Sequence, residues 1–288
     1  MNETAVVVAV DGSEANRAAL AWAVDAASRS RVRLTVATVA EPWQVVGPYV
    51  PDLPESDFAQ PIAERAAAQA AAAYPGGDVR TEVRVGHPVR VLQEVAAGQQ
   101  LLVLGKQGLG ALGRFFIGST SIAVAGRADV PVVVVPGHWD TTAHAGLPVV
   151  VGVDTDRTHA AALRHALAEA DRRRVPLVVV QAWEPRGVLA TDPELAAQVH
   201  AGWLQQGKRD LEEVVGRANQ EFPDVEVRIQ QTLGYPVHRL LEAADGAQLV
   251  VVGREEKRRL SGFALGSVAR GVLHQSETPV MVVPDPTT

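Results

Sequence analysis

Short apolar runs alternate with longer segments of mixed apolar and charged residues along the whole chain. The runs are rich in Val, Leu and Ala, and the segments between them have helical patterns, so alternating strands and helices are expected. Near-continuous apolar strands of this kind are typical of a parallel sheet that is covered on both faces, and the pattern therefore predicts an α/β fold. In the first half we predict strands at 5–10, 32–39, 79–85, 101–104 and 131–135, and helices at about 14–29 and 62–73.

The chain contains an internal duplication. Val6–Asp11 (VVVAVD) returns as Val149–Asp154 (VVVGVD), at an offset of 143 positions (149 − 6 = 143). Pro131–Pro136 (PVVVVP) returns as Pro279–Pro284 (PVMVVP), at an offset of 148 (279 − 131 = 148). The larger offset of the later pair predicts a small insertion in a loop or helix of the second copy.

Each copy is long enough to form a domain of its own. We predict a first domain at 1–137 and a second at 148–288, joined by a polar linker at 138–147 that lacks periodicity. The last strand of each copy is apolar and would be an exposed sheet edge, and pairing of the two copies through these strands is one way to cover it.

Composition and charge exclude several classes of protein. The chain has 47% hydrophobic and 21% charged residues, as soluble globular proteins do, and no cysteine, which removes disulfides and thiolate chemistry. A net charge of -6 does not supply the broad positive field that favours nucleic acid or an anionic membrane as a partner. The residues before Asp11 show neither a basic leader nor an apolar run of membrane-spanning length, so a cytoplasmic location is expected.

A glycine-rich segment follows the fourth predicted strand of the first copy. Two residues separate Gly105 from Gly108, and nine residues separate Gly108 from Gly118-Ser119, which opens a helix. Glycines allow a backbone to approach a ligand and to turn sharply, and the free N–H groups of a helix N-terminus attract anions. The spacing therefore favours a phosphate site at this end of the strand. Taken singly, each residue is equally typical of an ordinary turn or helix cap.

Other chemistry has little support. The segment lacks the lysine of a Walker A loop at the position where that loop has it, so strong NTPase activity is not implied. His159 and His165 are six residues apart, which is not the spacing that puts two ligands on one helix face, and no metal site is expected from the protein alone. Asp11-Gly12-Ser13 ends the first strand and offers a side-chain cap to the helix that follows.

The motif G-x2-G-x9-G-[ST], with Val10-Asp11 at the end of the first strand, resembles that of the ATP-binding universal stress proteins. The duplication resembles their tandem form. The resemblance implies two copies of a Rossmann-like, doubly wound five-stranded parallel sheet with strand order 3-2-1-4-5. It also implies halves that pair as a pseudo-dimer, a homodimer as a further assembly, and ATP as the ligand, with Mg as its metal.

The resemblance also implies roles for individual residues. Asp11 would approach the ribose or its associated metal, Ala9 and Val10 would wall the base, and the backbone at Val39 would recognise adenine. The ATP-binding set of the first half is completed by residues around the ribose and phosphates, which are Leu104, Gly105, Gly108, Gly118, Ser119, Thr120 and Ser121.

The second copy departs from this motif. Glu256 replaces its middle glycine, and a carboxylate there would repel phosphate, while Ala269 stands where the first copy has Ser121. Lys257–Arg259 would either neutralise a phosphate or form a solvated loop. We expect weaker or absent ATP binding here. The corresponding residues are Val153, Asp154, Ala182, Gly253, Gly266, Ser267 and Val268.

Three functions follow as hypotheses. The first is a stress-response regulator that binds ATP and hydrolyses it slowly or not at all. The second is an enzyme that cleaves ATP at the α-phosphate or transfers adenylate, which rests on fold analogy alone. The third is an interaction scaffold that needs no nucleotide, with an unknown protein partner.

Overall fold

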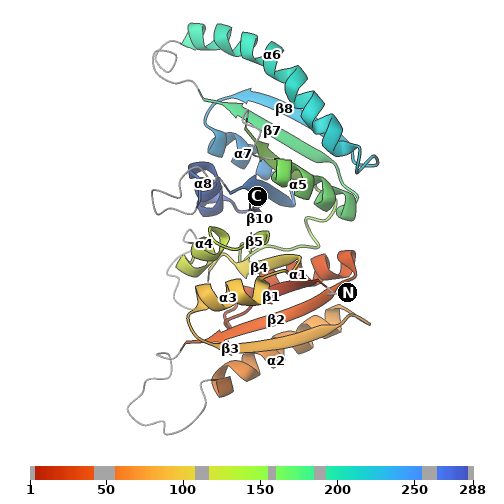
Figure 1. The fold of residues 1–288 in the computed structure, drawn as a ribbon, viewed down its shortest axis with the longest axis vertical. Helices are drawn as coiled ribbons and strands as arrows, with labels where there is room; N and C mark the ends of the chain where they lie inside the picture. The colour runs from red at the N-terminus through yellow and green to blue at the C-terminus, as the bar shows by residue number, and fades with distance from the viewer. Residues whose placement is uncertain are drawn as a thin grey trace. The chain divides into compact units, whose positions relative to one another are not determined.

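The computed structural model describes residues 4–41, 56–107, 117–154, 160–184, 193–254 and 265–284. The chain divides into two compact units, Met1–Ala143 and His144–Thr288. Each unit alternates strands with helices (Figure 1). Among the described residues no helix is long and apolar enough to cross a membrane.

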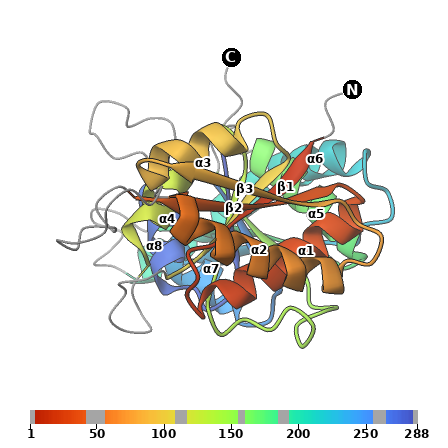
Figure 2. The ribbon, with the colours of Figure 1, turned by 90° about the horizontal axis from the view of Figure 1, so that it is seen from below.

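The first unit is a parallel sheet with strand order β3-β2-β1-β4-β5. Helices α1 and α2 pack together on one face of this sheet, and α3 and α4 pack together on the other (Figure 2). The elements are β1 (Ala5–Ala9), α1 (Asn16–Ser30), β2 (Arg33–Ala40), α2 (Ser56–Ala73), β3 (Val79–Val85), α3 (Pro88–Ala96), β4 (Leu101–Gly105), α4 (Ser119–Ala125) and β5 (Val132–Val135).

The second unit repeats this arrangement, with strand order β8-β7-β6-β9-β10 and all described pairs parallel. The predicted fold, two Rossmann-like α/β copies of strand order 3-2-1-4-5, is confirmed. The elements are β6 (Val149–Val153), α5 (Ala160–Arg173), β7 (Leu177–Trp183), α6 (Pro193–Asn219), β8 (Val227–Leu233), α7 (Pro236–Ala244), β9 (Leu249–Gly253), α8 (Ser267–Gln275) and β10 (Val280–Val283).

The strand registers locate the predicted insertion. Val6 pairs with Leu34 in the first unit and Val149 pairs with Leu177 in the second, so the offset is 143 in both strands (177 − 34 = 143). The next strand, β8, is already at the larger offset, because Val227 faces Leu177 as Val79 faces Leu34 (227 − 79 = 148). The extra residues therefore lie between β7 and β8, where α6 has 27 residues and its counterpart α2 has 18.

Continuous burial explains the apolar runs. Every residue of Val132–Val135 is buried, as are Val6, Val7 and Val8 at the centre of the first sheet. The edge strand β3 has only half-buried and exposed positions instead, and its sequence carries charges for that reason. The prediction that the inner strands are covered on both faces is confirmed.

The structure corrects two helix starts. The helix predicted at 14–29 begins at Asn16, and its N-cap position is Ala15, with no side-chain cap hydrogen bond. The expectation that Asp11-Gly12-Ser13 caps this helix is therefore wrong, because two further residues separate this turn from the helix. The helix predicted at 62–73 extends back to Ser56 and contains Pro61.

Candidate functional site

The candidate site lies where the strand order of the first unit reverses. β1 and β4 are neighbours in the sheet, yet the chain leaves them in opposite directions, towards β2 and towards β5. In open α/β sheets a ligand binds outside the carboxyl ends of the strands at such a switch point. Asp11 follows β1 and Gly105 ends β4, so the fold brings two predicted site residues to this position.

Asp11 is held in place by local hydrogen bonds. Its Oδ1 accepts one from the backbone N–H of Ser13 (2.9 Å) and one from Nδ2 of Asn16 (2.6 Å). The turn between them needs Gly12, whose φ of 83° lies in the left-handed region that glycine favours. A Cβ atom on Gly12 would also lie 3.3 Å from Cδ1 of Ile62, so α2 packs against this turn. The carboxylate is thus presented in one orientation at the edge of the sheet.

Asn16 connects the two strand ends, and the sequence analysis did not identify it. The residue is buried, and its Oδ1 would lie 2.8 Å from a Cβ atom on Gly105. That Cβ atom would also lie 3.1 Å from the carbonyl oxygen of Gln107. Gly105 therefore has a reason within the protein for lacking a side chain, in addition to the expected approach of a ligand.

The first turn of α4 offers unused backbone donors. Gly118 is its N-cap, without a side-chain cap hydrogen bond, and the N–H of Gly118 donates to the carbonyl oxygen of Lys106 (2.8 Å). The first bond along the helix runs from the N–H of Ile122 to the carbonyl oxygen of Gly118 (3.1 Å). The amides of Ser119, Thr120 and Ser121 precede that bond and have no acceptor within the helix.

Gly118 is not required by the fold. Its φ of -63° and ψ of 143° suit any residue, and a Cβ atom there would meet its nearest neighbours at 3.8 Å, an ordinary contact. Among the described residues, therefore, neither the backbone conformation nor the packing demands a glycine here. An anion beside the first amides of α4 stays a prediction.

The side chain of Ser121 has a hydrogen-bond partner within the protein, and the predicted part of Ser121 in phosphate binding stays a prediction for its backbone amide. Its hydroxyl is buried and donates to the carbonyl oxygen of Gly105 (2.8 Å), so its proton is directed at the protein and not at a phosphate. Ser119 is exposed and Thr120 is half-buried, which keeps both hydroxyls available at the helix N-terminus.

A buried lysine stands beside the site. Lys106 directly follows Gly105, is 4% exposed, and donates from its backbone N–H to the carbonyl oxygen of Val135 (2.7 Å). Arg254 occupies the same place after Gly253 in the second unit, with its N–H donating to Val283 (2.8 Å). A cation thus directly follows the glycine at the end of the fourth strand in both copies, away from the Walker position, and this repeat of Lys106 as Arg254 is visible in the sequence.

The remaining predicted residues of the first unit lie at the carboxyl ends of neighbouring strands. Ala9 ends β1 and Val10 follows it, while Val39 lies near the end of β2 and Leu104 near the end of β4. The N–H of Val10 still donates to Ala37 of β2 (2.9 Å), which keeps the two strand ends together. Gly108 lies outside the described residues.

The corresponding residues of the second unit lie at the same strand ends and helix start as in the first unit. Val153 ends β6 and Asp154 follows it, while Ala182 lies in β7 and Gly253 ends β9. Gly266 is the N-cap of α8, and the N–H of Arg270 donates to its carbonyl oxygen (3.0 Å), so the amides of Ser267 and Val268 have no acceptor within the helix.

Two differences distinguish the candidate site of the second unit from that of the first. Ala269 is buried where the first unit has Ser121, so no side-chain hydroxyl there can reach the carbonyl of Gly253. Asp154 is exposed, whereas Asp11 is half-buried. Glu256 and Lys257–Arg259 lie outside the described residues, and their effect on binding stays a prediction.

Side chains that could bind a metal do not cluster in the described parts of either site. Within the described ranges no group of three or more His, Asp or Glu side chains is placed to hold a metal ion. His165 lies on α5, where burial lowers its pKa, opposed by the charge of Glu169, while Arg172 and Arg164 lower it further. His159 lies outside the described residues.

The chain matches known proteins over its whole length. The universal stress protein family model matches residues 4–136 and 147–284. A universal stress protein of Mycolicibacterium smegmatis is 35% identical over 292 residues, which cover 98% of this chain and 97% of that protein. Universal stress protein Rv2005c of Mycobacterium tuberculosis is 33% identical over 291 residues, which cover 96% of each chain.

A solved structure shares the fold. The crystal structure of a universal stress protein from Archaeoglobus fulgidus has a TM-score of 0.72 at 19% identity, and the match covers 98% of this chain and 96% of that one. Since the family model matches both halves and full-length relatives exceed 30% identity, this chain belongs to the universal stress protein family, in its tandem form with two such domains.

Proposed function

We propose that the protein is an ATP-binding regulator of the stress response whose first unit holds the nucleotide at the switch point between β1 and β4. The observation that carries the proposal is the N-terminus of α4. It combines amides that lack acceptors within the helix with a glycine, Gly118, that the fold itself does not need. Backbone donors beside open space are what a phosphate group requires.

The residues at the site fit a nucleoside triphosphate. The amides of Ser119, Thr120 and Ser121 would bind phosphate oxygens. Lys106 directly follows the last residue of β4 and would add positive charge near this end of the sheet. Asp11, which follows β1, would approach the ribose or its associated metal, as the family resemblance implies. Ala9 and Val10 would wall the base, and the backbone at Val39 would recognise adenine.

The same residues favour binding over rapid chemistry. The Oδ1 atom of Asp11 already accepts two hydrogen bonds, which suits an orienting role better than proton abstraction. ATP would arrive with Mg²⁺, which neutralises phosphate charge. We therefore propose slow or no hydrolysis, with nucleotide occupancy shifting the population of conformations that a protein partner recognises.

We propose that the second unit binds ATP more weakly or not at all. Val268 and Ala269 replace the hydroxyl-bearing Thr120 and Ser121 of the first unit, and Glu256 brings negative charge into the loop. The pairing of the two copies with each other and the alternative of a homodimer stay predictions.

The proposal is tested by titrating the full chain with MgATP in a calorimeter. We expect one tight site per chain, and we expect Gly118→Val to abolish it because a branched side chain would fill the space beside the α4 amides. Gly266→Val makes the same change in the second unit and serves as the matched control, with wild-type affinity expected. Unchanged affinity in Gly118→Val, at an unchanged far-ultraviolet circular dichroism spectrum, would contradict the mapped site.

Two further measurements separate the alternatives. Mass spectrometry of the small molecules that are released when purified protein is denatured identifies a bound nucleotide directly, and an absence of both copurified and titrated nucleotide favours the scaffold hypothesis. Accumulation of AMP and pyrophosphate during a long incubation with ATP favours the enzyme hypothesis.

A further inference from the structure

Asn16 is a buried polar side chain that helix stability does not explain. It is the first residue of α1, where its side chain makes no cap hydrogen bond, since the N-cap position is Ala15. Asparagine has a lower helix propensity than alanine, and burial of its amide costs free energy unless the amide is hydrogen-bonded. The residue is nevertheless 8% exposed. Its presence needs another reason.

The contacts of Asn16 supply that reason. Its Nδ2 donates to Oδ1 of Asp11 at 2.6 Å, and this oxygen also accepts the backbone N–H of Ser13 at 2.9 Å. Two donors that converge on one oxygen fix the rotation of the carboxylate. On its other side, Oδ1 of Asn16 lies against Gly105, within 2.8 Å of the place that a Cβ atom would occupy. Asn16 therefore spans from the end of β1 to the end of β4.

We propose that Asn16 is a positioning residue that sets the preference of the first unit for a ribose sugar, by holding the Asp11 carboxylate towards the sugar hydroxyls. This inference rests on the proposed function, because it assigns Asp11 to the ribose of a bound nucleotide. A carboxylate discriminates between sugars only if it is held where the hydroxyls arrive, since a rotating carboxylate loses part of each hydrogen bond to entropy.

The second copy has a different residue at this place. His159 stands 143 positions after Asn16, whereas Asp154 retains the acidic residue at the position of Asp11. The residue that orients the carboxylate thus differs between the copies while the carboxylate itself does not. The change is in keeping with a sugar preference built into the first unit.

Two variants and one control test the proposal in the full chain. Asn16→Ala removes the donor to Asp11, and Asn16→Asp keeps the shape but places a second carboxylate against it. Gln99→Ala is the matched control, because the Oε1 atom of Gln99 accepts the backbone N–H of Ala5 (2.9 Å) at the opposite end of β1. The control Gln99→Ala, like Asn16→Ala, removes a side-chain amide, but at a half-buried position far from the site. Calorimetric titration with ATP and with 2′,3′-dideoxy-ATP measures the sugar preference.

We expect the wild type and Gln99→Ala to prefer ATP over the dideoxy nucleotide by about tenfold or more, the effect of a hydrogen bond to a charged group. In both Asn16 variants the preference is expected to fall to about twofold or less, and in Asn16→Ala the affinity for the dideoxy nucleotide stays near the wild-type value. A residue with a merely structural role would weaken both ligands alike and leave their ratio unchanged.

The outcomes separate this inference from the proposed function. If the wild type binds neither nucleotide, the proposed function fails and the inference falls with it. If the wild type binds ATP and the Asn16 variants keep the full preference, the inference alone is overturned.

Discussion

The hydroxyl of Ser121 donates a hydrogen bond of 2.8 Å to the carbonyl oxygen of Gly105, and it thereby ties the first turn of α4 to the last residue of β4. This bond and the one from the N–H of Gly118 to the carbonyl oxygen of Lys106 together join the two ends of the glycine-rich segment. The second unit has no equivalent, because Ala269 lacks a hydroxyl. The bond is therefore a feature of the first copy and of its site.

Removal of this bond should cost stability. In Ser121→Ala the buried carbonyl of Gly105 loses its side-chain donor, so we expect the free energy of unfolding to fall by about 1–3 kcal/mol. Urea denaturation measures the change. Ser119→Ala removes an exposed hydroxyl two residues earlier and should stay within about 0.5 kcal/mol of the wild type. Equal stability of the two variants would show that the bond contributes nothing.

Gly105 and Gly118 should respond differently to the same substitution. Gly105→Ala places a Cβ atom 2.8 Å from Oδ1 of Asn16 and 3.1 Å from the carbonyl oxygen of Gln107, so we expect a loss of about 1–3 kcal/mol. Gly118→Ala meets only ordinary contacts among the described residues, so it should cost no more than about 1 kcal/mol, the small loss expected when alanine replaces glycine at an N-cap. Thermal and urea unfolding compare the two. A larger loss in Gly118→Ala than in Gly105→Ala would contradict the idea that Gly118 is kept for a ligand.

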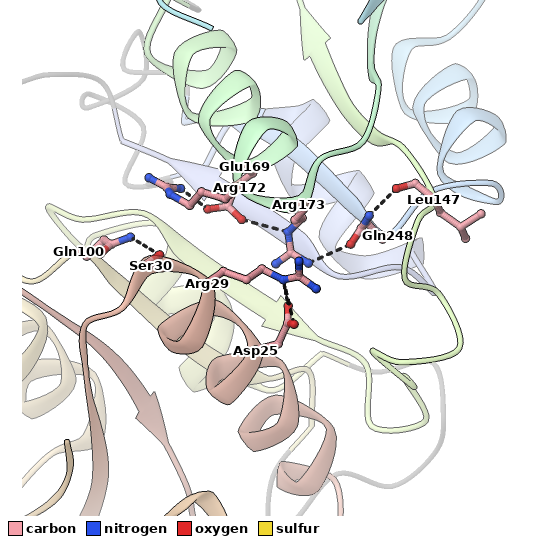
Figure 3. A network of polar contacts seen from close by, with 9 residues as sticks. All are labelled: Asp25, Arg29, Ser30, Gln100, Leu147, Glu169, Arg172, Arg173 and Gln248. Carbon is pink, nitrogen blue, oxygen red and sulfur yellow. Dashed lines mark hydrogen bonds and ion pairs between the residues drawn. The ribbon is translucent and has the colours of Figure 1, made fainter. Parts of the chain in front are cut away.

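A buried polar network in the second unit should be far more sensitive than a surface ion pair. Arg173, whose side chain is 2% exposed, donates from Nε to Glu169 (3.1 Å) and from Nη1 to Gln248 (2.9 Å), and Gln248 in turn donates to the carbonyl oxygen of Leu147 (Figure 3). Glu169→Ala leaves a buried guanidinium without its carboxylate, for which we expect a loss of about 3–5 kcal/mol.

The control for that prediction is an exposed pair on α3. Arg90 and Glu94 are joined at 2.8 Å with side chains 83% and 61% exposed, so Glu94→Ala should change the free energy of unfolding by less than about 1 kcal/mol. Denaturant unfolding of both variants gives the comparison. Similar losses in Glu169→Ala and Glu94→Ala would mean that burial does not strengthen the network.

His165 should make stability depend on pH. Burial lowers its pKa, so the unfolded chain takes up the proton first as the pH falls. The stability that the neutral imidazole contributes is present above its ordinary pKa of 6.5 and is lost as the pH falls below that value. Unfolding free energies measured between about pH 8 and pH 5 should therefore fall less in His165→Gln than in the wild type. Parallel curves would exclude His165 as a source of the pH dependence.

The fold was predictable because its signals are local. The run Val6–Val8 is apolar throughout because both faces of this inner strand are covered, and the second copy repeats the pattern of the first. The site was predictable only in outline. Asn16 could not be found from the sequence, because its contact with Gly105 exists only once β1 and β4 are neighbours. Ser121 was assigned to phosphate for the same reason, since its acceptor is sixteen residues away in the chain.

The most direct test of the account is amide hydrogen exchange of the full chain, resolved by residue, with and without MgATP. If ATP binds in the first unit as proposed, it slows amide exchange at Ser119, Thr120 and Ser121. Exchange at Ser267, Val268 and Ala269 of the second unit then stays close to its rate without ATP. Unaltered exchange at the first three amides under saturating ATP, or equal protection at both sets, would contradict it.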